Sequence, residues 1–395
     1  MKNLQSNFFL MNNTIQNYAW GSTDSMTALF DTANPQQEPQ AEMWMGDHPN
    51  GCSKICSGEH EILLSDFIAS DIDAVLGRSA AFKAMPFLFK VLAAEKALSV
   101  QVHPNKQQAE TGFALEEKSG IAQDASNRNY RDANHKPELV FALTKYQAMN
   151  GFRDLQTIAD DFDRLDISSL NEALNHFKAD FCEQGLARFF SAVLSLHSEQ
   201  KDQAIEHLLH YAAQQSATRF ELIMQLKEQY PGDIGLFSPL FLHTVTLQPG
   251  QAMFLDAGTP HAYIHGTALE IMANSDNVLR AGLTPKYIDV AELIDKTRFN
   301  ALKYEQLCLE PVREQNSEHY LVPVDDFRFS VYKQPQKQQL QVDTAEILFA
   351  VDAEASLVHS SGEEIIFNKG QAVFIPAYAQ EYSISTKGTL ARAYC

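Results

Sequence analysis

Hydrophobic residues recur every three or four positions between residues 151 and 234. Two runs with this spacing are Leu170, Ala173, Leu174, Phe177 and Leu186, Phe189, Phe190, Val193. No proline interrupts residues 138–230, and Gly185 is the only glycine within residues 152–231. This period, free of helix breakers, predicts amphipathic helices that pack against one another. We therefore expect an inserted, all-helical domain.

On both sides of this stretch the pattern changes to short apolar runs separated by Gly, Pro, Asn and Asp. Examples are residues 86–91, 139–143 and 242–247. Short runs bounded by turn residues predict β-strands. Many such strands favour a sandwich, barrel or jelly roll over a parallel α/β sheet.

One eight-residue segment is repeated at an offset of 120 residues. Residues 250–257 (GQAMFLDA) recur as residues 370–377 (GQAVFIPA), with five identities. The repeat predicts two related β-units. The first copy is followed by Thr259-Pro260-His261, whereas Gln380 and Glu381 align with Pro260 and His261 in the second. If the first unit holds a metal, we expect the second to have lost the site and to serve packing.

These patterns predict a mainly β protein with additional helices. A chain of 395 residues exceeds the size at which one hydrophobic core stops growing. We expect a discontinuous first β-domain (1–150 and 235–312), the helical domain (151–234) and a second β-domain (313–395). The segment 310–339, rich in Gln, Pro and charge, is expected to connect the β-units.

The charge balance and the cysteines limit the partners and the compartment. A formal net charge of −19 disfavours binding to nucleic acid or to an anionic membrane. The five cysteines are odd in number and lack paired zinc-type spacing, which is typical of reduced cytoplasmic thiols. The apolar run 8–11 is too short for a signal peptide, and no stretch reaches the about 18 apolar residues of a membrane span. We expect a soluble, cytoplasmic protein.

Three segments offer metal-binding side chains: residues 99–104 (SVQVHP), residues 135–138 (HKPE) and residues 259–261 (TPH). Residues two apart in a strand share a face, so Gln101 and His103 would point into one cavity, with Ser99 beside them. A site of Gln, His, Glu and His would suit zinc but also manganese, iron or nickel. Separations of tens of residues are no zinc signature, so the residues alone leave the metal open.

Seven ordered motifs between residues 15 and 290 resemble those of the type I phosphomannose isomerases, whereas the C-terminal part resembles them more by pattern. The motifs are residues 18–22 (YAWGS), 41–46 (AEMWMG), 86–96 (PFLFKVLAAEK), 101–103 (QVH), 135–138 (HKPE), 258–263 (GTPHAY) and 274–286 (NSDNVLRAGLTPK). The resemblance implies a cupin core with an inserted helical domain and a second, degenerate cupin jelly roll. The loop at residues 47–52 departs from the family pattern.

The resemblance also implies the site. One Zn²⁺ per chain would be held by Gln101, His103, Glu138 and His261, and Arg280 would be an active-site residue. The implied reaction is the reversible isomerisation of mannose 6-phosphate and fructose 6-phosphate. The expected protein is a monomer acting on a small sugar phosphate.

Moving a carbonyl from C1 to C2 requires removal of a C–H proton and stabilisation of an enediolate. His135 and Lys136 are the candidate bases, and the sequence does not choose between them. Arg280 would stabilise the enediolate or bind phosphate. The further candidates for substrate binding are Lys286, Ser99 and Lys90 for the phosphate, and Glu270, Asp276 and Tyr263 for hydroxyl groups.

Two other readings compete with this one. A non-catalytic cupin that binds a sugar or a metal would not need Arg280, His135 and Lys136 together. A cupin oxygenase usually holds iron with histidines and a carboxylate, and Gln101 as a ligand argues against it.

Overall fold

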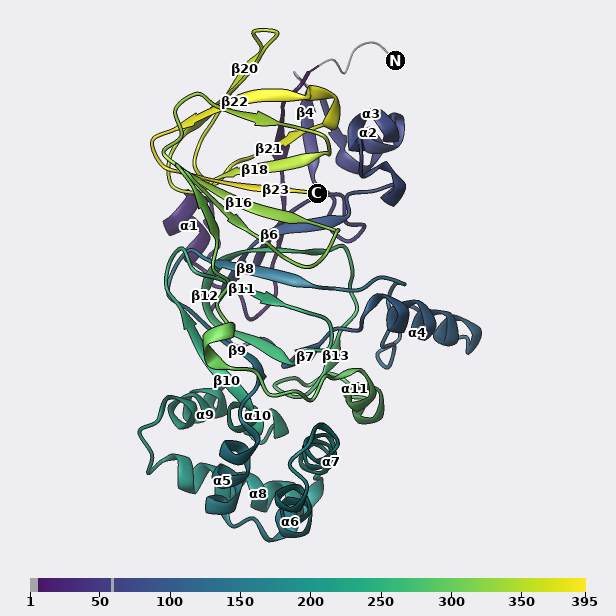
Figure 1. Ribbon diagram of the computed structural model, residues 1–395, viewed down its shortest axis with the longest axis vertical. Coiled ribbons are helices and arrows are strands. Elements are labelled where there is room, and N and C mark those ends of the chain that lie inside the picture. Colours follow the sequence, from purple (N-terminus) through teal and green to yellow (C-terminus); the bar gives the residue numbers. More distant parts are fainter. Residues whose placement is uncertain (1–5, 58–59) are drawn as a thin grey trace.

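The computed structural model describes residues 6–57 and 60–395, so residues 1–5 of the predicted first domain and residues 58–59 lie outside the described part. Figure 1 shows three tiers along the longest axis: strands that include the C-terminus, a middle tier of strands, and a layer of helices at the far end. The predicted class, mainly β with an inserted helical domain, is confirmed.

The middle tier is a ten-stranded antiparallel sheet centred on β12, a long strand that pairs with four others. Its strands are β2 (Thr14–Gln16), β3 (Glu42–Met45), β6 (Phe87–Ala94), β7 (Gln101–Val102), β8 (Glu138–Ala142), β9 (Tyr146–Phe152), β10 (Leu242–Leu247), β11 (Ala252–Leu255), β12 (His261–Ala273) and β13 (Leu279–Arg280). The apolar runs 86–91, 139–143 and 242–247 fall on β6, β8 and β10, as predicted.

The upper tier combines strands from both ends of the chain. The nine-stranded sheet runs in the order β14 (Val312–Glu314), β15 (Ser317–Tyr320), β16 (Arg328–Lys333), β23 (Thr389–Tyr394), β18 (Glu346–Ala350), β21 (Ala372–Ile375), β1 (Phe9–Asn12), β4 (Lys54–Ser57), β5 (His60–Leu63). Phe9 of β1 pairs with Phe374 of β21, so the N-terminal strand belongs to the sheet of the C-terminal unit. The predicted boundaries at residues 150, 234 and 312 stay a proposal.

A four-stranded sheet completes the upper tier, in the order β17 (Gln338–Gln341), β22 (Glu381–Thr386), β19 (Ala355–His359), β20 (Glu364–Phe367). The side chains of Leu348, Leu357 and Ile384 belong to one buried apolar cluster formed by the two sheets. The interpretation of residues 310–339 as a connection was wrong, because β14 to β16 and part of β17 lie there. Exposure hid the pattern of β14 alone, which is exposed at every residue, whereas β15 and β16 are mostly buried.

The sequence repeat is also a structural repeat. Gly250 and Gly370 both have left-handed backbone conformations, with φ of 89° and 77°, at the turns before β11 and β21. The backbone N–H of Gly250 donates to Ala142 O, and that of Gly370 donates to Ala350 O. Because β11 pairs with β8 as β21 pairs with β18, the two units share one local architecture.

The helical tier consists of α5 (Leu155–Leu165), α6 (Asn171–Ala179), α7 (Glu183–Leu194), α8 (Ser198–Ala212), α9 (Thr218–Gln229) and α10 (Ser238–Phe241). Its core contains an aromatic cluster in which Phe162 contacts Phe189, with ring centroids 4.8 Å apart, and Phe241, at 4.9 Å. Burial of each such ring contributes roughly 1.5–3 kcal/mol. The predicted helices are therefore held together mainly by tertiary packing.

The remaining α-helices are α1 (Ser25–Phe30), α2 (Leu64–Ser70), α3 (Ile72–Leu76), α4 (Lys106–Lys118) and α11 (Val290–Lys296). Figure 1 shows α4 projecting from the side of the middle tier. Within the described residues, no helix is long and apolar enough to cross a membrane.

Candidate metal centre

Three side chains from distant parts of the chain converge inside the middle tier. One ligand atom from each of His103, Glu138 and His261 lies within 4.8 Å of the other two, and all three residues are buried. His103 Nε2 is 3.2 Å from Glu138 Oε1, and His261 Nε2 is 3.4 Å from Glu138 Oε2. The fold thus brings three of the four proposed metal ligands together.

The hydrogen bonds of the two histidines fix which ring nitrogen carries a proton. His103 Nδ1 is 2.6 Å from Asn277 O, and His261 Nδ1 is 2.9 Å from Thr259 O. A carbonyl oxygen only accepts, so Nδ1 donates in both rings, and the neutral tautomer with this proton has its lone pair on Nε2, the atom that faces Glu138. Burial lowers the pKa of His103 to about 4, which keeps this ring neutral near pH 7.

The buried centre therefore contains more acceptors than donors. His103 Nε2 is fully buried and has no hydrogen-bond partner among the residues that the structure describes. Two imidazole lone pairs and a carboxylate that face one another are the donor set of a divalent metal site, and zinc accepts nitrogen and oxygen ligands of this kind. The residues present fit a metal ion.

Two neighbours stabilise the ionised form of Glu138. Burial opposes its ionisation, but the charge of Lys136, whose Nζ lies 3.0 Å from Oε1, helps to lower the pKa of Glu138 well below its ordinary value. Tyr263 donates a 2.6 Å hydrogen bond to Glu138 Oε2. Because burial raises the pKa of Tyr263, its hydroxyl stays protonated and engaged with Glu138, which favours a supporting role over contact with a substrate hydroxyl.

A row of residues crosses five strands through the centre. Asn150 pairs with both His243 and His261, His261 pairs with Gln101, and Gln101 pairs with Arg280. Directly opposed residues in antiparallel strands place their side chains on the same face. Gln101 therefore lies between His261 and Arg280, as expected for a fourth ligand. That Gln101 binds the metal stays a prediction.

Beyond Gln101 the surface carries several positive charges. Burial lowers the pKa of Arg280, and the charge of Arg131 acts in the same direction. The pKa of Lys286 is also lowered, by burial and by repulsion from Arg280 and Arg131. Three cationic groups that repel one another at a half-buried surface favour an anionic ligand.

Lys90, a candidate for phosphate binding, has carboxylates as its partners. Its Nζ is buried and lies 3.0 Å from Glu270 and 3.7 Å from Glu42. Although burial opposes it, these carboxylates raise the pKa of Lys90 above its ordinary value. The charge of Lys90 is already neutralised, so Lys90 and Glu270 form a buried ion cluster beside the metal centre.

Asp276 and Ser99 lie nearer the surface. Asp276 accepts from Asn50 Nδ2 at 3.0 Å and lies 3.4 Å from His48 Nε2. The loop at residues 47–52 therefore contacts a candidate substrate-binding residue. Ser99 is half-buried, just before Val100, whose N–H donates to Gly282 O. Neither residue contacts the metal-binding histidines.

His135 does not contact the metal-type cluster. Its Nε2 lies 2.9 Å from Asp326 Oδ2, and Asp326 belongs to the segment before β16. A carboxylate accepts, so Nε2 donates to Asp326, and the neutral tautomer of this ring has its lone pair on Nδ1. The structure thus separates the two candidate bases, with Lys136 beside Glu138 and His135 held by the C-terminal unit.

Models of one family match most of the chain. The model for the catalytic domain of phosphomannose isomerase type I matches residues 8–155, that for its helical insertion domain matches residues 165–242, and that for the mannose-6-phosphate isomerase cupin domain matches residues 316–395. This chain is a type I phosphomannose isomerase by family. The resemblance inferred from the seven motifs is confirmed.

Relatives across the family are similar over nearly their whole length. Mannose-6-phosphate isomerase of Escherichia coli (strain K12) is 44% identical over 386 residues, covering 97% of this chain and 98% of the relative. The enzyme of Homo sapiens is 34% identical over 404 residues, covering 93% of each. A crystal structure of zinc-bound mannose 6-phosphate isomerase superposes with a TM-score of 0.93 at 43% identity, covering 98% of this chain and 99% of the other.

The second cupin unit of this phosphomannose isomerase has an ion pair at the position corresponding to the metal centre. Glu346 pairs with Ile375 in the strand register in which Glu138 pairs with Leu255. Tyr382 donates to Glu346 as Tyr263 donates to Glu138. In the second unit the cation beside the carboxylate is the guanidinium of Arg392, whose Nε lies 3.0 Å from Glu346 Oε2.

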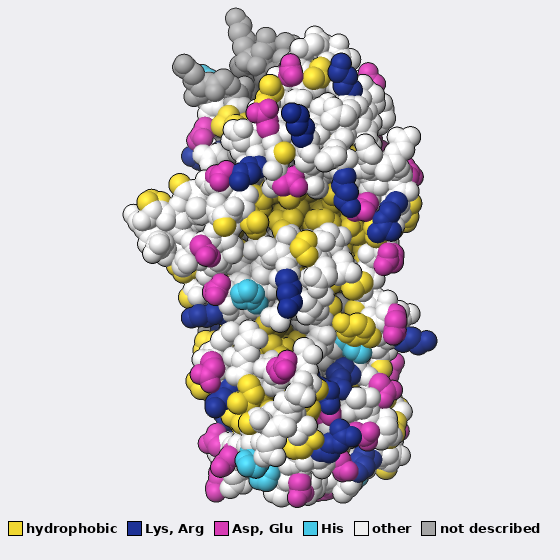
Figure 2. Space-filling view, turned by 90° about the vertical axis from the view of Figure 1, so that its left-hand side faces the viewer, with side chains coloured by type: hydrophobic (Ala, Val, Ile, Leu, Met, Phe, Trp, Pro, Cys, Tyr) yellow, Lys and Arg dark blue, Asp and Glu magenta, His cyan; other side chains and the backbone are white. Residues whose placement is uncertain are grey.

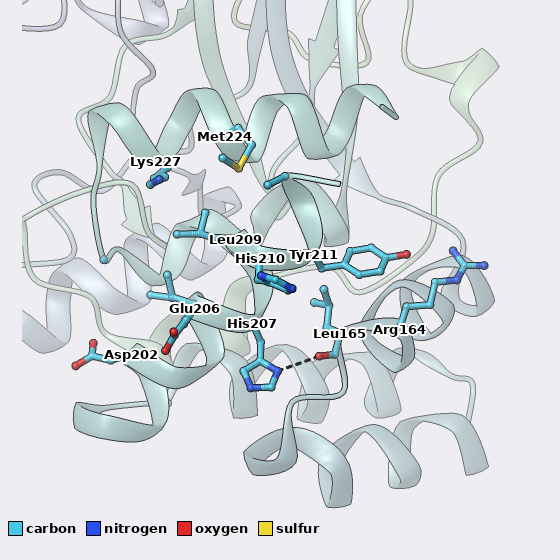
Figure 3. A pocket seen from close by; sticks show the side chains of 13 residues that line it. Arg164, Leu165, Asp202, Glu206, His207, Leu209, His210, Tyr211, Met224 and Lys227 are labelled. Carbon is cyan, nitrogen blue, oxygen red and sulfur yellow. Dashed lines mark hydrogen bonds between the residues drawn. The ribbon is translucent and has the colours of Figure 1, made fainter. Parts of the chain in front are cut away.

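A separate cavity of about 870 Å³ lies among the helices (Figure 3). Its walls include Asp202 and Glu206 as well as Arg164 and Lys227, so charges of both signs line it. Figure 2 likewise shows acidic and basic side chains interspersed over one long face, with a hydrophobic band across its upper half. His207 and His210 also line the cavity, but among the described residues only His103, Glu138 and His261 bring their ligand atoms within reach of one ion.

Sequence reasoning missed three residues beside the site: Asn277, Arg131 and Asp326. Asn277 O holds His103, and Asn277 Oδ1 accepts from Arg131 N at 2.7 Å. Asn277 lies within a quoted motif, so its place beside Arg280 was a usable signal. Arg131 and Asp326 lie in irregular segments, where no periodicity indicates which way a side chain points.

Proposed function

We propose that this chain catalyses the reversible isomerisation of D-mannose 6-phosphate and D-fructose 6-phosphate with one Zn²⁺ per chain. One observation carries the proposal: the Nε2 lone pairs of His103 and His261 converge on the Glu138 carboxylate, beside a cationic pocket at Arg280. A metal next to an anion site suits the metal-assisted isomerisation of a sugar phosphate. The full-length similarity to enzymes with this activity supports it.

Gln101, His103, Glu138 and His261 would hold the zinc. When bound, zinc acts as a Lewis acid that polarises the sugar oxygens at C1 and C2. Tyr263 keeps Glu138 oriented through its hydrogen bond, and the carbonyl groups of Asn277 and Thr259 keep both imidazoles in the ligating tautomer.

The substrate phosphate would bind to Arg280, Lys286 and Arg131. Their mutual repulsion is relieved when a phosphate dianion lies between them, and arginine suits phosphate because its planar fork donates two parallel hydrogen bonds. The exposed position of Lys286 puts this end of the pocket near solvent. The reacting carbons would then lie toward the buried metal centre.

His135 is the proposed base. It would take the proton from C2 of the open-chain aldose, leaving an enediolate, and return a proton to C1 while the hydroxyl proton moves from O2 to O1. Its Nε2 donates to Asp326, so Nδ1 is free to accept. Lys136 lies beside Glu138 and would act as a cation that stabilises the enediolate oxygens.

The finer substrate contacts are proposals as well. Asp276 and Ser99 line the approach to the pocket and would bind sugar hydroxyl groups, whereas Lys90 and Glu270 would set the charge around the metal. We further propose a monomer in the cytoplasm that serves carbohydrate metabolism. All five cysteines are unpaired, which suits a reducing compartment.

The reaction is tested with purified protein and mannose 6-phosphate in an assay that couples fructose 6-phosphate formation to a dehydrogenase. Sustained turnover, and the reverse reaction from fructose 6-phosphate, are expected. A folded, zinc-loaded sample without turnover in either direction would contradict the proposal and favour a non-catalytic cupin that binds a sugar.

A further inference from the structure

A second cationic cavity lies at the junction of the helical tier and the middle sheet. Its volume is about 490 Å³, within the range of small-molecule sites. It is lined by Arg153, Ser216, Ala217, Thr218, Arg219, Leu242, His243, Thr244, Thr246 and Tyr304. This lining contains two guanidinium groups and five hydroxyl groups but no carboxylate.

The arginines at this cavity are incompletely neutralised. Asp161 is buried and lies 2.8 Å from Arg153, 2.8 Å from Arg219 and 3.5 Å from Arg164. One carboxylate thus serves three guanidinium groups. Arg219 Nε is buried and has no hydrogen-bond partner among the described residues. Asp154 also acts on Arg153, and Glu305 on His243, but neither carboxylate is paired with the arginines among the described residues, so a partial surplus of positive charge remains at the cavity.

Burial gives this surplus an energetic cost. Burial lowers the pKa of Arg153, and the charge of Arg219 acts in the same direction, against the stabilising contact with Asp161. His243 adds no charge near pH 7, because burial lowers its pKa too. A bound anion would offset the repulsion between the guanidinium groups.

The start of α9 adds further donors. The residue before the helix is Ala217, and no side chain caps this end. In the part of the chain that the structure describes, the N–H groups of Thr218 and Arg219 have no acceptor. Unsatisfied N–H groups and the helix dipole both favour an anion here, next to the two arginines.

The cavity is remote from the proposed catalytic phosphate pocket. His243 and Arg280 stand at opposite ends of the row that runs through Asn150, His261 and Gln101. Four strand spacings of about 4.8 Å lie between the two ends, which amounts to roughly 19 Å measured along the sheet. One sugar phosphate bound at the metal centre cannot reach both pockets.

We propose that this cavity is a second binding site for a small phosphate-bearing metabolite, with the phosphate between Arg153, Arg219 and the start of α9. A smaller adjoining cavity shares Thr218, Thr244 and Thr246 and adds Gln147, Gln225 and Glu221. Amide and carboxylate groups recognise hydroxyl groups, so a phosphorylated polyhydroxy compound matches the combined surface.

The site is tested by equilibrium dialysis of zinc-loaded protein against inorganic phosphate. Arg280→Ala weakens the catalytic pocket, so phosphate that this variant still binds reports the second site. Adding Thr218→Asp places a carboxylate in the cavity while favouring the start of α9. We expect this change, or Arg219→Gln, to weaken the remaining binding at least tenfold, about 1.4 kcal/mol.

Arg164→Gln is the matched control, because Arg164 contacts Asp161 but does not line this cavity. It is expected to bind phosphate like its parent. If Arg219→Gln fails to fold, phosphate binding by Thr218→Asp alone tests the proposal. The proposal is overturned if Arg280→Ala abolishes all phosphate binding, if Thr218→Asp leaves the remaining binding intact, or if Arg164→Gln weakens it equally.

Discussion

His135 and Asp326 lie 2.9 Å apart, Nε2 to Oδ2, although 191 positions separate them in the chain. Asp326 belongs to the second β-unit, and its side chain is 10% exposed. The second β-unit therefore contributes Asp326, whose side chain orients His135, a candidate base of the first unit.

This contact predicts that Asp326→Ala lowers kcat, because His135 loses the acceptor that fixes its ring. Misplacement of a reacting group by about 1 Å can cost roughly 100-fold, so we expect a loss of 10-fold or more with little change in KM. Asp326→Asn keeps an acceptor oxygen and should retain much of the rate. Asp325→Ala is the control, since the Asp325 side chain is 99% exposed. Equal kcat in Asp326→Ala and Asp325→Ala would exclude the positioning role.

Arg280→Ala is expected to reduce kcat/KM by roughly 100-fold or more, about 2.7 kcal/mol of transition-state stabilisation, while zinc content stays unchanged. The arginine acts on substrate charge and is not a metal ligand. Steady-state kinetics and elemental analysis on the same sample check both parts. Arg298→Ala, which removes a surface partner of Asp256, should behave like wild type. Wild-type turnover in Arg280→Ala would refute the role.

His261→Ala should lose zinc and activity together, because it removes one of the converging lone pairs. His265→Ala is a matched control on the same strand, since His265 is half exposed and outside the cluster. Zinc is measured by atomic emission after dialysis. Stoichiometric zinc in His261→Ala would remove His261 from the ligand set.

Arg392→Met should destabilise the protein without affecting zinc. It leaves the buried carboxylate of Glu346 without its cation, and breaking a buried ion pair typically costs about 3–5 kcal/mol. Replacing both partners, as Glu346→Gln with Arg392→Met, should recover part of the loss. Chemical denaturation measures the stability of both variants and shows whether the double variant is the more stable one. If Arg392→Met unfolds at the wild-type midpoint, the pair contributes nothing to stability.

The sequence predicted those features that depend on local pattern. The period of residues 151–234 indicated helices, and the repeat at Gly250 and Gly370 identified two equivalent turns. Four ligand candidates followed from motif resemblance, and the fold brings the side chains of three of them together. Residue spacing alone left both the metal and the ligand set open.

Long-range relationships could not be predicted in this way. The pairing of Phe9 with Phe374 and the contact between His135 and Asp326 depend on tertiary packing, which local periodicity does not encode. The expectation for Lys90 illustrates the limit: a lysine beside a phosphate pocket and one neutralised by Glu270 look the same in sequence. Likewise, β14 within residues 310–339 was hidden because all of its residues are exposed.

The most direct test of the account is the isomerase assay on one sample before chelation, after chelation, and after zinc is added back. The account predicts that activity is lost with zinc and returns in proportion to zinc bound, up to one ion per chain. Full activity in protein shown to be free of metal would contradict it.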